Sequence, residues 1–287
     1  MPHRRRLPDP ATSSCHLSMS RTRPLTALVL AAAVSVAACD SITSGSSGNP
    51  IGVGGITART KGSGFTTDPQ IGFYRVSSAS FMTTSGVPDT CFIAAYSTST
   101  SSGGTTSATA LSAGPSLVFQ VGSRTDTLKQ AGPSLDPVYK SVLASGIPYT
   151  PGDSFVVTVP GSTGGFPPGT FRGRTAEAFT VAPVTLPAAG TPMTVNWTPA
   201  GDGTSAMYMT FRYYGTATST DYDRQVACSF ADDGSGTIPA TMAGLWVAST
   251  KRDLLAQRMR AMLSQVDVPR AYFNLVSTFD WPTPVSP

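Results

Sequence analysis

The chain has 287 residues, of which 40% are hydrophobic, and this length is enough for one large domain or two smaller domains with a buried core. The formal net charge is +4, but five arginines and a single aspartate precede Cys39, so the fifteen basic and fifteen acidic side chains from Cys39 onward balance. A balanced charge offers no broad electrostatic surface for nucleic acid, so we expect no nucleic-acid partner.

Histidine occurs only near the start of the chain, at His3 and His16. A Ser-His-Asp or Cys-His catalytic group, or a zinc site of the common histidine-containing types, therefore cannot form after Cys39. The sequence also lacks a Gly-x-Ser-x-Gly elbow, a Ser-x-x-Lys pair and a Walker loop. We expect no cofactor and no enzymatic activity, and a glycoside hydrolase that uses two carboxylates is the remaining catalytic alternative.

The segment from Met19 to Cys39 has the arrangement of a secretion signal. Two arginines precede an uncharged apolar stretch at 25–38, which is too short to span a membrane, because a span needs about 20 apolar residues. The last four residues, Val36-Ala37-Ala38-Cys39, resemble the lipobox of bacterial lipoproteins. This resemblance implies removal of residues 1–38, attachment of lipid to Cys39 and anchoring in the bacterial cell envelope. We also expect Met19 to be the true start, because the prolines and arginines before it do not fit a signal sequence.

The next segment, residues 39–65, is predicted to be the lipidated cysteine and a flexible linker, because it is rich in serine, glycine and threonine. From Thr66 onward, short apolar runs alternate with glycine, proline and aspartate, which favours strands and turns. The clearest strand candidates are Phe92–Tyr96, Leu117–Val121, Phe155–Val159, Phe171–Val181, Met193–Trp197, Met207–Tyr214, Gln225–Phe230 and Phe273–Phe279. We therefore predict an all-β protein with one or two immunoglobulin-like β-sandwich domains.

The glycine- and proline-rich segment at 161–169 is the best internal boundary on composition. We accordingly predict an N-terminal β domain at 66–165 and a C-terminal β-sandwich domain at 166–287. The run Thr194-Val-Asn-Trp197-Thr-Pro199, followed by a tyrosine-rich strand, resembles strands B and C of fibronectin type III domains. The resemblance implies a fibronectin III or immunoglobulin-like fold for the C-terminal domain, although Cys228 departs from that family's pattern.

Residues 251–266 fit two structures. Thr250 and Asp253 are spaced as in a helix capping box, and Leu255, Met259, Met262 and Leu263 would then share one helical face. A strand over 258–266 that pairs with the strand at Phe273 fits a sandwich equally well. We favour the strand.

Two cysteines remain after Cys39, namely Cys91 and Cys228. Outside the cytoplasm an even pair favours a disulfide. Each cysteine also lies inside an apolar strand, where a lone buried cysteine is ordinary. The sequence leaves both alternatives open.

Two acidic clusters, Asp221/Asp223 and Asp232/Asp233, offer oxygen ligands for Ca²⁺. Neither cluster has the spacing of an EF-hand loop. The run Asp232-Asp233-Gly234 is also what a tight hairpin turn needs. We favour the turn and expect no metal.

Trp246, Tyr213 and Tyr214 are candidates for stacking on a sugar, although such side chains more often pack in a core. The leading hypothesis is a lipid-anchored envelope protein with a non-enzymatic role in adhesion, scaffolding or ligand binding. Its expected partners are the membrane, through the lipid anchor, and an envelope protein or polysaccharide. A carbohydrate-binding module is the first alternative.

Overall fold

The computed structural model describes residues 48–76, 88–96, 108–131, 138–216, 221–267 and 270–281. Cys39 and the predicted leader lie outside these residues. The described part consists of strands joined by turns and loops, together with one short helix, α2 (Ala240–Val247). The strands are β1 (Pro50–Lys61), β2 (Gly64–Thr67), β3 (Gln70–Val76), β4 (Thr90–Ala95), β5 (Ala108–Ala110), β6 (Ser116–Val121), β7 (Arg124–Ala131), β8 (Val138–Ser141), β9 (Ile147–Tyr149), β10 (Ser154–Val159), β11 (Gly169–Arg174), β12 (Met193–Asn196), β13 (Ser205–Tyr213), β14 (Arg224–Ala231), β15 (Ser235–Ile238), β16 (Arg252–Asp267) and β17 (Arg270–Asp280).

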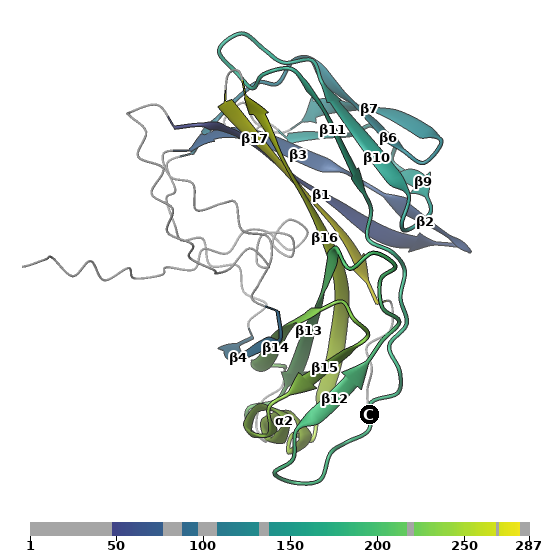
Figure 1. Cartoon of the computed structure of the whole chain (residues 1–287), viewed down its shortest axis with the longest axis vertical. Helices are drawn as coiled ribbons and strands as arrows, with labels where there is room; N and C mark the ends of the chain where they lie inside the picture. The colour runs from purple at the N-terminus through teal and green to yellow at the C-terminus, as the bar shows by residue number, and fades with distance from the viewer. Residues whose placement is uncertain are drawn as a thin grey trace, which may run out of the picture.

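One continuous sheet connects two lobes (Figure 1). Its strand order is β11-β10-β6-β7-β8-β3-β1-β17-β16-β13-β14-β4, and β2, β5 and β9 are attached beside this path. β12 and β15 form a separate two-stranded sheet. The long strands β16 and β17 pass from one lobe to the other. The upper lobe in Figure 1 contains β1–β3 and β5–β11, and the lower lobe contains β4, β12–β15 and α2.

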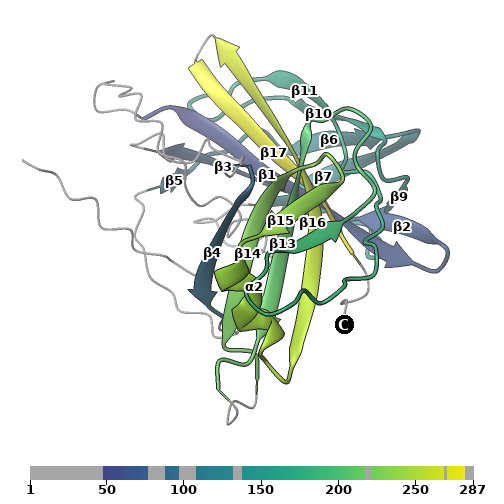
Figure 2. The same cartoon turned by 60° about the horizontal axis from the view of Figure 1, so that its bottom comes forward.

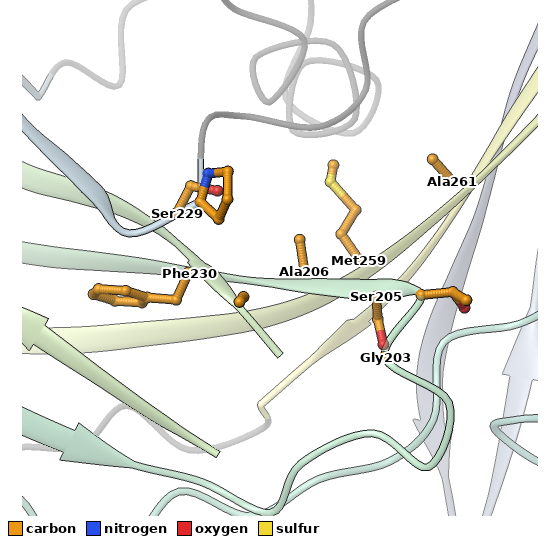
Figure 3. A pocket seen from close by; sticks show the side chains of 10 residues that line it. Gly203, Ser205, Ala206, Ser229, Phe230, Met259 and Ala261 are labelled. Atoms are coloured by element: carbon orange, nitrogen blue, oxygen red, sulfur yellow. The ribbon is translucent and has the colours of Figure 1, made fainter. Parts of the chain in front are cut away.

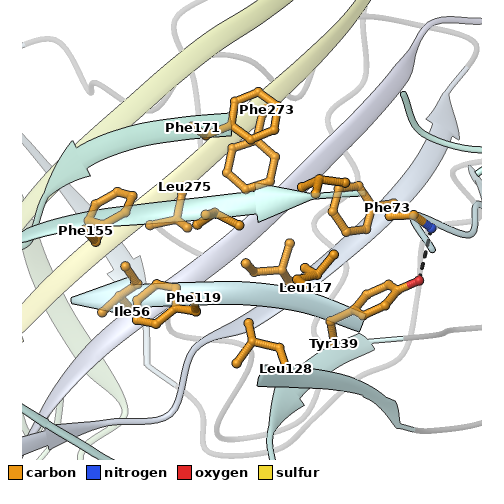
Figure 4. Packing of buried hydrophobic residues seen from close by; sticks show 14 of the residues in the cluster. Ile56, Phe73, Leu117, Phe119, Leu128, Tyr139, Phe155, Phe171, Phe273 and Leu275 are labelled. Atoms are coloured by element: carbon orange, nitrogen blue, oxygen red, sulfur yellow. Dashed lines mark hydrogen bonds between the residues drawn. The ribbon is translucent and has the colours of Figure 1, made fainter. Parts of the chain in front are cut away.

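The core of the upper lobe is rich in phenylalanine (Figure 4). Phe171 and Phe273 stack with their ring centroids 4.1 Å apart, and Phe73 packs against Phe273 at 6.2 Å. The hydroxyl of Tyr139 donates to the carbonyl of Gly114 at 2.7 Å, so the polar end of this buried ring is satisfied. These rings hold β3, β8, β11 and β17 around one core.

The core of the lower lobe lies between two sheets. Met207, Met209 and Phe211 point into it from alternate positions of β13, as the sequence pattern predicts. Trp197, which directly follows β12 of the opposite sheet, packs against Phe230 with ring centroids 5.7 Å apart. β12 and β13 thus belong to different sheets, which is the arrangement of strands B and C in an immunoglobulin-type sandwich.

The predicted all-β class with sandwich packing is confirmed. Each predicted strand corresponds to an observed one, except that the segment predicted at 171–181 leaves the strand after Arg174. The strand prediction for 251–266 is also confirmed, because Ser264 of β16 is the register partner of Phe273. The helical alternative is wrong: 252–267 is one strand, and Leu263, which the helix would place on its apolar face beside Met259, is 53% exposed.

The predicted linker at 39–65 is wrong from residue 50 onward. Those residues form β1 and β2, and β1 lies between β3 and β17 near the middle of the sheet. The glycines of β1 suggested flexibility, but they allow buried side chains of neighbouring strands to pack closely against the β1 backbone. A Cβ atom on Gly52 would lie 2.6 Å from a ring carbon of Phe273, so a side chain has no room there.

The predicted domain boundary at 165/166 is also wrong. Phe166, Phe171 and the start of β17 belong to the upper core, although they come from the predicted C-terminal domain. In the opposite direction, β4 from the predicted N-terminal domain pairs with β14 in the lower lobe. Pairing between distant segments, rather than composition, decides where each lobe begins and ends.

Two arginines of β16 fix the junction between the lobes. The guanidinium of Arg258 is buried and donates to the carbonyls of Ala178 at 3.2 Å and of Thr198. Arg260 makes a two-bond contact with the carboxylate of Asp202, at 2.7 Å for each bond. Because these contacts join β16 to the segments before and after β12, they hold the lower lobe against the shared strands.

Candidate binding face

The lower sheet has one face that points away from both cores, and we call it the outer face. Alternate residues of four neighbouring strands form it, as the strand register requires. They are Thr90, Phe92 and Ala94 of β4, Gln225, Ala227, Ser229 and Ala231 of β14, Ala206, Tyr208, Thr210 and Arg212 of β13, and Asp253, Leu255, Gln257 and Met259 of β16.

One end of the outer face is hollowed (Figure 3). The hollow has a volume of about 290 Å³ and lies where small side chains meet from three strands. Figure 3 shows the side chains of Ala206, Met259 and Ala261 projecting from one side of the ribbon. The lining residues are Pro88, Gly203, Thr204, Ser205, Ala206, Ser229, Phe230, Ala231, Met259 and Ala261.

The chemistry of the hollow is neutral. None of the ten lining residues that the structure describes has an ionisable side chain, so these residues supply no general acid, general base or charged nucleophile. The hydroxyl of Ser229 lies in the wall, is buried, and has no hydrogen-bond partner within the described part of the chain. Because an unpaired buried hydroxyl is costly, it favours a ligand that brings a hydrogen-bonding group.

An arginine held between two tyrosine rings occupies the other end of the outer face. The guanidinium of Arg212 lies 5.3 Å from the ring centre of Tyr96 and 4.8 Å from that of Tyr222. It also donates to both carboxylate oxygens of Asp253, with the Nε bond at 2.8 Å. The hydrogen bonds that Arg212 donates to Asp253 raise the pKa of Arg212 above its ordinary value, although burial acts in the opposite direction.

Further aromatic and basic groups continue this cluster. The rings of Tyr214 and Tyr222 meet edge to face with centroids 5.4 Å apart, and the ammonium of Lys251 lies 5.2 Å from the ring centre of Tyr214. Burial raises the pKa of Tyr222, and the negative charge of Asp253 raises it further. The cluster therefore presents π-faces and fixed positive charge together.

Two of the three predicted stacking residues are in the wrong place for that role. Trp246 is fully buried, and its indole N–H donates to the carbonyls of Arg212 and Asp253 at 3.1 Å each. Tyr213 points into the lower core and is 5% exposed. Strand alternation places its neighbour Tyr214 in the aromatic cluster instead. These corrections follow from packing, since a large ring at an inward position fills the core.

The predicted calcium candidates are mostly bound to protein groups. The carboxylate of Asp232 is buried, lies 2.6 Å from Arg258 and accepts the indole N–H of Trp197 at 2.8 Å. Asp223 accepts the backbone N–H of Gly215 at 2.6 Å. Among the residues that the structure describes, no group of three or more metal-ligating side chains forms.

The turn predicted at 232–234 also needs a correction. It connects β14 to β15, but β15 pairs with β12 rather than with β14. The connection is therefore a corner between two sheets and not a hairpin. Asp233 accepts the backbone N–H of Ser235 at 3.2 Å within this corner, which explains the favourable turn composition.

Two carboxylates meet at the lobe junction, but arginines bind both of them. Arg260 contacts Glu177 at 3.5 Å and Asp202 at 2.7 Å, and Arg174 contacts the same two residues at 3.8 and 3.5 Å. Burial raises the pKa of Asp202, but hydrogen bonds from Thr204 and Arg260 outweigh it and lower the pKa below its ordinary value of 3.8. Neither carboxylate lines the hollow.

Cys91 and Cys228 form a disulfide between β4 and β14. They are register partners, with their Cα atoms 4.1 Å apart. The disulfide therefore ties an edge strand from the first half of the chain to the sheet of the lower lobe. Of the two alternatives that the sequence leaves open, the structure has the disulfide.

Sequence reasoning did not find the residues at the centre of the aromatic cluster. Arg212 and Tyr96 are 116 positions apart and meet only because β4 joins the lower sheet. Alternation within the predicted strand 207–214 does place Arg212 on the solvent side. That signal identifies its face but not its partners.

Comparison with known proteins adds little to this description. No family model and no curated protein matches the chain. Among solved structures, the yeast delta-COP-I mu-homology domain is similar at 7% identity and a TM-score of 0.24, over 83% of this chain and 97% of that chain. A similarity at this level carries no argument about fold or function.

Within the described ranges, no helix is both long enough and apolar enough to cross a membrane.

Proposed function

We propose that the protein is a lipid-anchored protein of the bacterial cell envelope that binds a neutral ligand in the hollow of the outer face, without catalysis. The hollow carries the binding part of this proposal, because its ten described lining residues have no ionisable group and include Ser229, whose hydroxyl has no partner among the described residues. A small apolar group with one hydrogen-bonding atom fits that lining. The sequence from Val36 to Cys39 supports the anchor.

A neutral fluorescent probe, N-phenyl-1-naphthylamine, tests the hollow. Probe fluorescence is expected to rise on mixing with the purified protein. Ala206→Phe should abolish the rise, because the larger ring fills the space beside Met259 and Ala261. Ala227→Phe is the matched control, since Ala227 lies on the same face but does not line the hollow. A rise that persists in Ala206→Phe would exclude this site.

Metabolic labelling with palmitate tests the anchor separately. The label is expected on the wild-type protein and not on Cys39→Ser. Cys15→Ser is the control, because this cysteine precedes the proposed start at Met19 and should not affect labelling. Labelled Cys39→Ser protein, or unlabelled wild type, would contradict the anchor without bearing on the hollow.

A carbohydrate ligand at the aromatic cluster is a second candidate function. Tyr96 and Tyr222 flank Arg212, and Tyr214 packs against Tyr222. Sugar rings commonly stack on aromatic faces beside polar groups. A glycan array with the purified protein tests it. Binding should be lost in Tyr214→Ala and kept in Tyr272→Ala, a tyrosine of the upper lobe. An array without a hit would remove this candidate.

A further inference from the structure

The lower sheet ends at β4, and the residues of this edge strand favour pairing with a further strand. β4 pairs with β14 on one side, and none of the strands that the structure describes pairs with its other side. Figure 2 shows β4 beside β14 at the margin of the lower lobe. Its six residues contain no charge, proline or glycine, which are the features that usually protect an edge strand from association.

Two large apolar side chains are exposed on this edge. Phe92 is 52% exposed and Ile93 is 48% exposed, and they point to opposite faces of the sheet. If another strand paired with this edge, its side chains would cover the exposed apolar groups on both faces of β4. The disulfide from Cys91 to β14 keeps the edge in place.

The strand register shows which backbone groups face outward. Cys91 and Cys228 face each other with Cα atoms 4.1 Å apart, which is the spacing of a pair that does not exchange backbone hydrogen bonds. The N–H and C=O of Cys91, and by alternation those of Ile93 and Ala95, therefore point away from β14. The N–H of Tyr96, at an alternate position, donates back to Asp223 at 2.8 Å, as this register requires.

We propose that β4 is a dimerisation edge, where β4 of a second copy of this chain pairs antiparallel across a twofold axis at Phe92. In this register the two Phe92 rings lie opposite each other on the outer face, as a favourable cross-strand aromatic pair. Cys91 of each copy exchanges backbone hydrogen bonds with Ile93 of the other copy. The two lower sheets thereby become one.

Charge complementarity selects this register. Asp89 directly precedes β4, in a turn with φ +61°, so with the axis at Phe92 it lies beside Ala95 of the second copy, whose register partner on β14 is Arg224. Asp89 is then about two strand spacings, roughly 10 Å between Cα atoms, from Arg224 of the second copy. Both side chains are exposed, and an arginine side chain can cover that separation. The same pair forms twice by symmetry.

Co-purification of two differently tagged full-length copies tests the dimer, and light scattering of the purified full chain gives its mass. We expect the wild-type copies to co-purify. Phe92→Lys in both copies should abolish this, because two lysines would face each other at the axis. Val118→Lys is the matched control, since Val118 is a comparably exposed apolar residue of β6, at 43%. Far-UV circular dichroism checks that each variant is folded.

A charge exchange tests the register itself. Asp89→Arg should weaken co-purification by placing two arginines together, and the double variant Asp89→Arg with Arg224→Asp should restore it. This second test does not depend on whether Phe92→Lys folds. A wild-type chain that is monomeric overturns the proposal, as does a dimer that Phe92→Lys and Asp89→Arg leave intact. Capture of an unrelated protein in place of the second copy also overturns it.

Discussion

Gly52 and Phe273 are register partners in the parallel pairing of β1 and β17, and the Phe273 ring occupies the space where a Cβ of residue 52 would lie. The distance would be 2.6 Å to Phe273 and 2.9 Å to Phe73, and both rings are fully buried. We therefore expect Gly52→Ala to lower the free energy of unfolding by roughly 1–3 kcal/mol, as overpacking of a core does. Urea denaturation measures this change.

Gly64→Ala is the control for this substitution. It lies in β2, and its nearest neighbour atom would be 4.0 Å from the new Cβ. Its effect should stay within about 0.5 kcal/mol. If the two variants unfolded alike, residues 50–61 would behave as the linker that composition suggests rather than as a strand of the core.

The class of fold could be predicted from sequence because it depends on local signals. Alternation at Met207, Met209 and Phe211 marks a strand wherever that strand pairs. The position of β1 could not be predicted, because its glycines are favourable only beside the rings of Phe73 and Phe273. Phe73 comes from β3 and Phe273 from β17, which lies more than 200 positions further along the chain than β1. Without these partners the composition of β1 resembles that of a flexible segment.

In the candidate site, too, local sequence signals predict which face a residue occupies but not its partners. The sequence places Arg212 on the outward side of its strand. Of the two tyrosines beside it, Tyr96 directly follows β4 and Tyr222 lies in the segment before β14. For Trp246 the sequence suggests a binding role that the structure does not support. As a tryptophan it is a residue type that often stacks on ligands. Its structural role is seen only in the structure, where its indole N–H donates to the carbonyls of Arg212 and Asp253.

The buried pair of Arg258 and Asp232 should contribute strongly to stability. The exposed fractions of the two side chains are 1% and 0%, so removing one partner leaves the other charge buried and unpaired. We expect Asp232→Ala to lower the free energy of unfolding by about 3–5 kcal/mol. Asp68→Ala removes the partner of Arg59, in a pair with side chains 31% and 45% exposed, and should cost at most about 1 kcal/mol. Equal effects in urea denaturation would contradict the structural role of the buried pair.

The Cys91–Cys228 disulfide closes a loop across 137 positions of the chain. In the chain-entropy model a loop of this length stabilises the folded state by up to about 5 kcal/mol. Dithiothreitol should therefore shift the urea midpoint of the wild type downward. The Cys91→Ser/Cys228→Ser double variant should unfold at the lower midpoint with or without reductant. A wild-type midpoint unaffected by dithiothreitol, after loss of the disulfide is verified by mass spectrometry, would show that β4 does not depend on the bond.

Asp202 should make stability fall in acid, because its pKa is lower in the folded state than its ordinary value of 3.8. The unfolded chain then binds the proton more tightly, so the contribution of Asp202 is fully present above about pH 4 and is lost as the pH falls through the folded-state pKa. Asp202→Asn should remove this part of the acid dependence, so its difference from wild type should shrink below pH 4. Thr204→Val removes one of the hydrogen bonds that lower the pKa and should give an intermediate slope. Urea titrations between pH 2.5 and 6 measure these slopes, and a constant difference between wild type and Asp202→Asn would contradict the assignment.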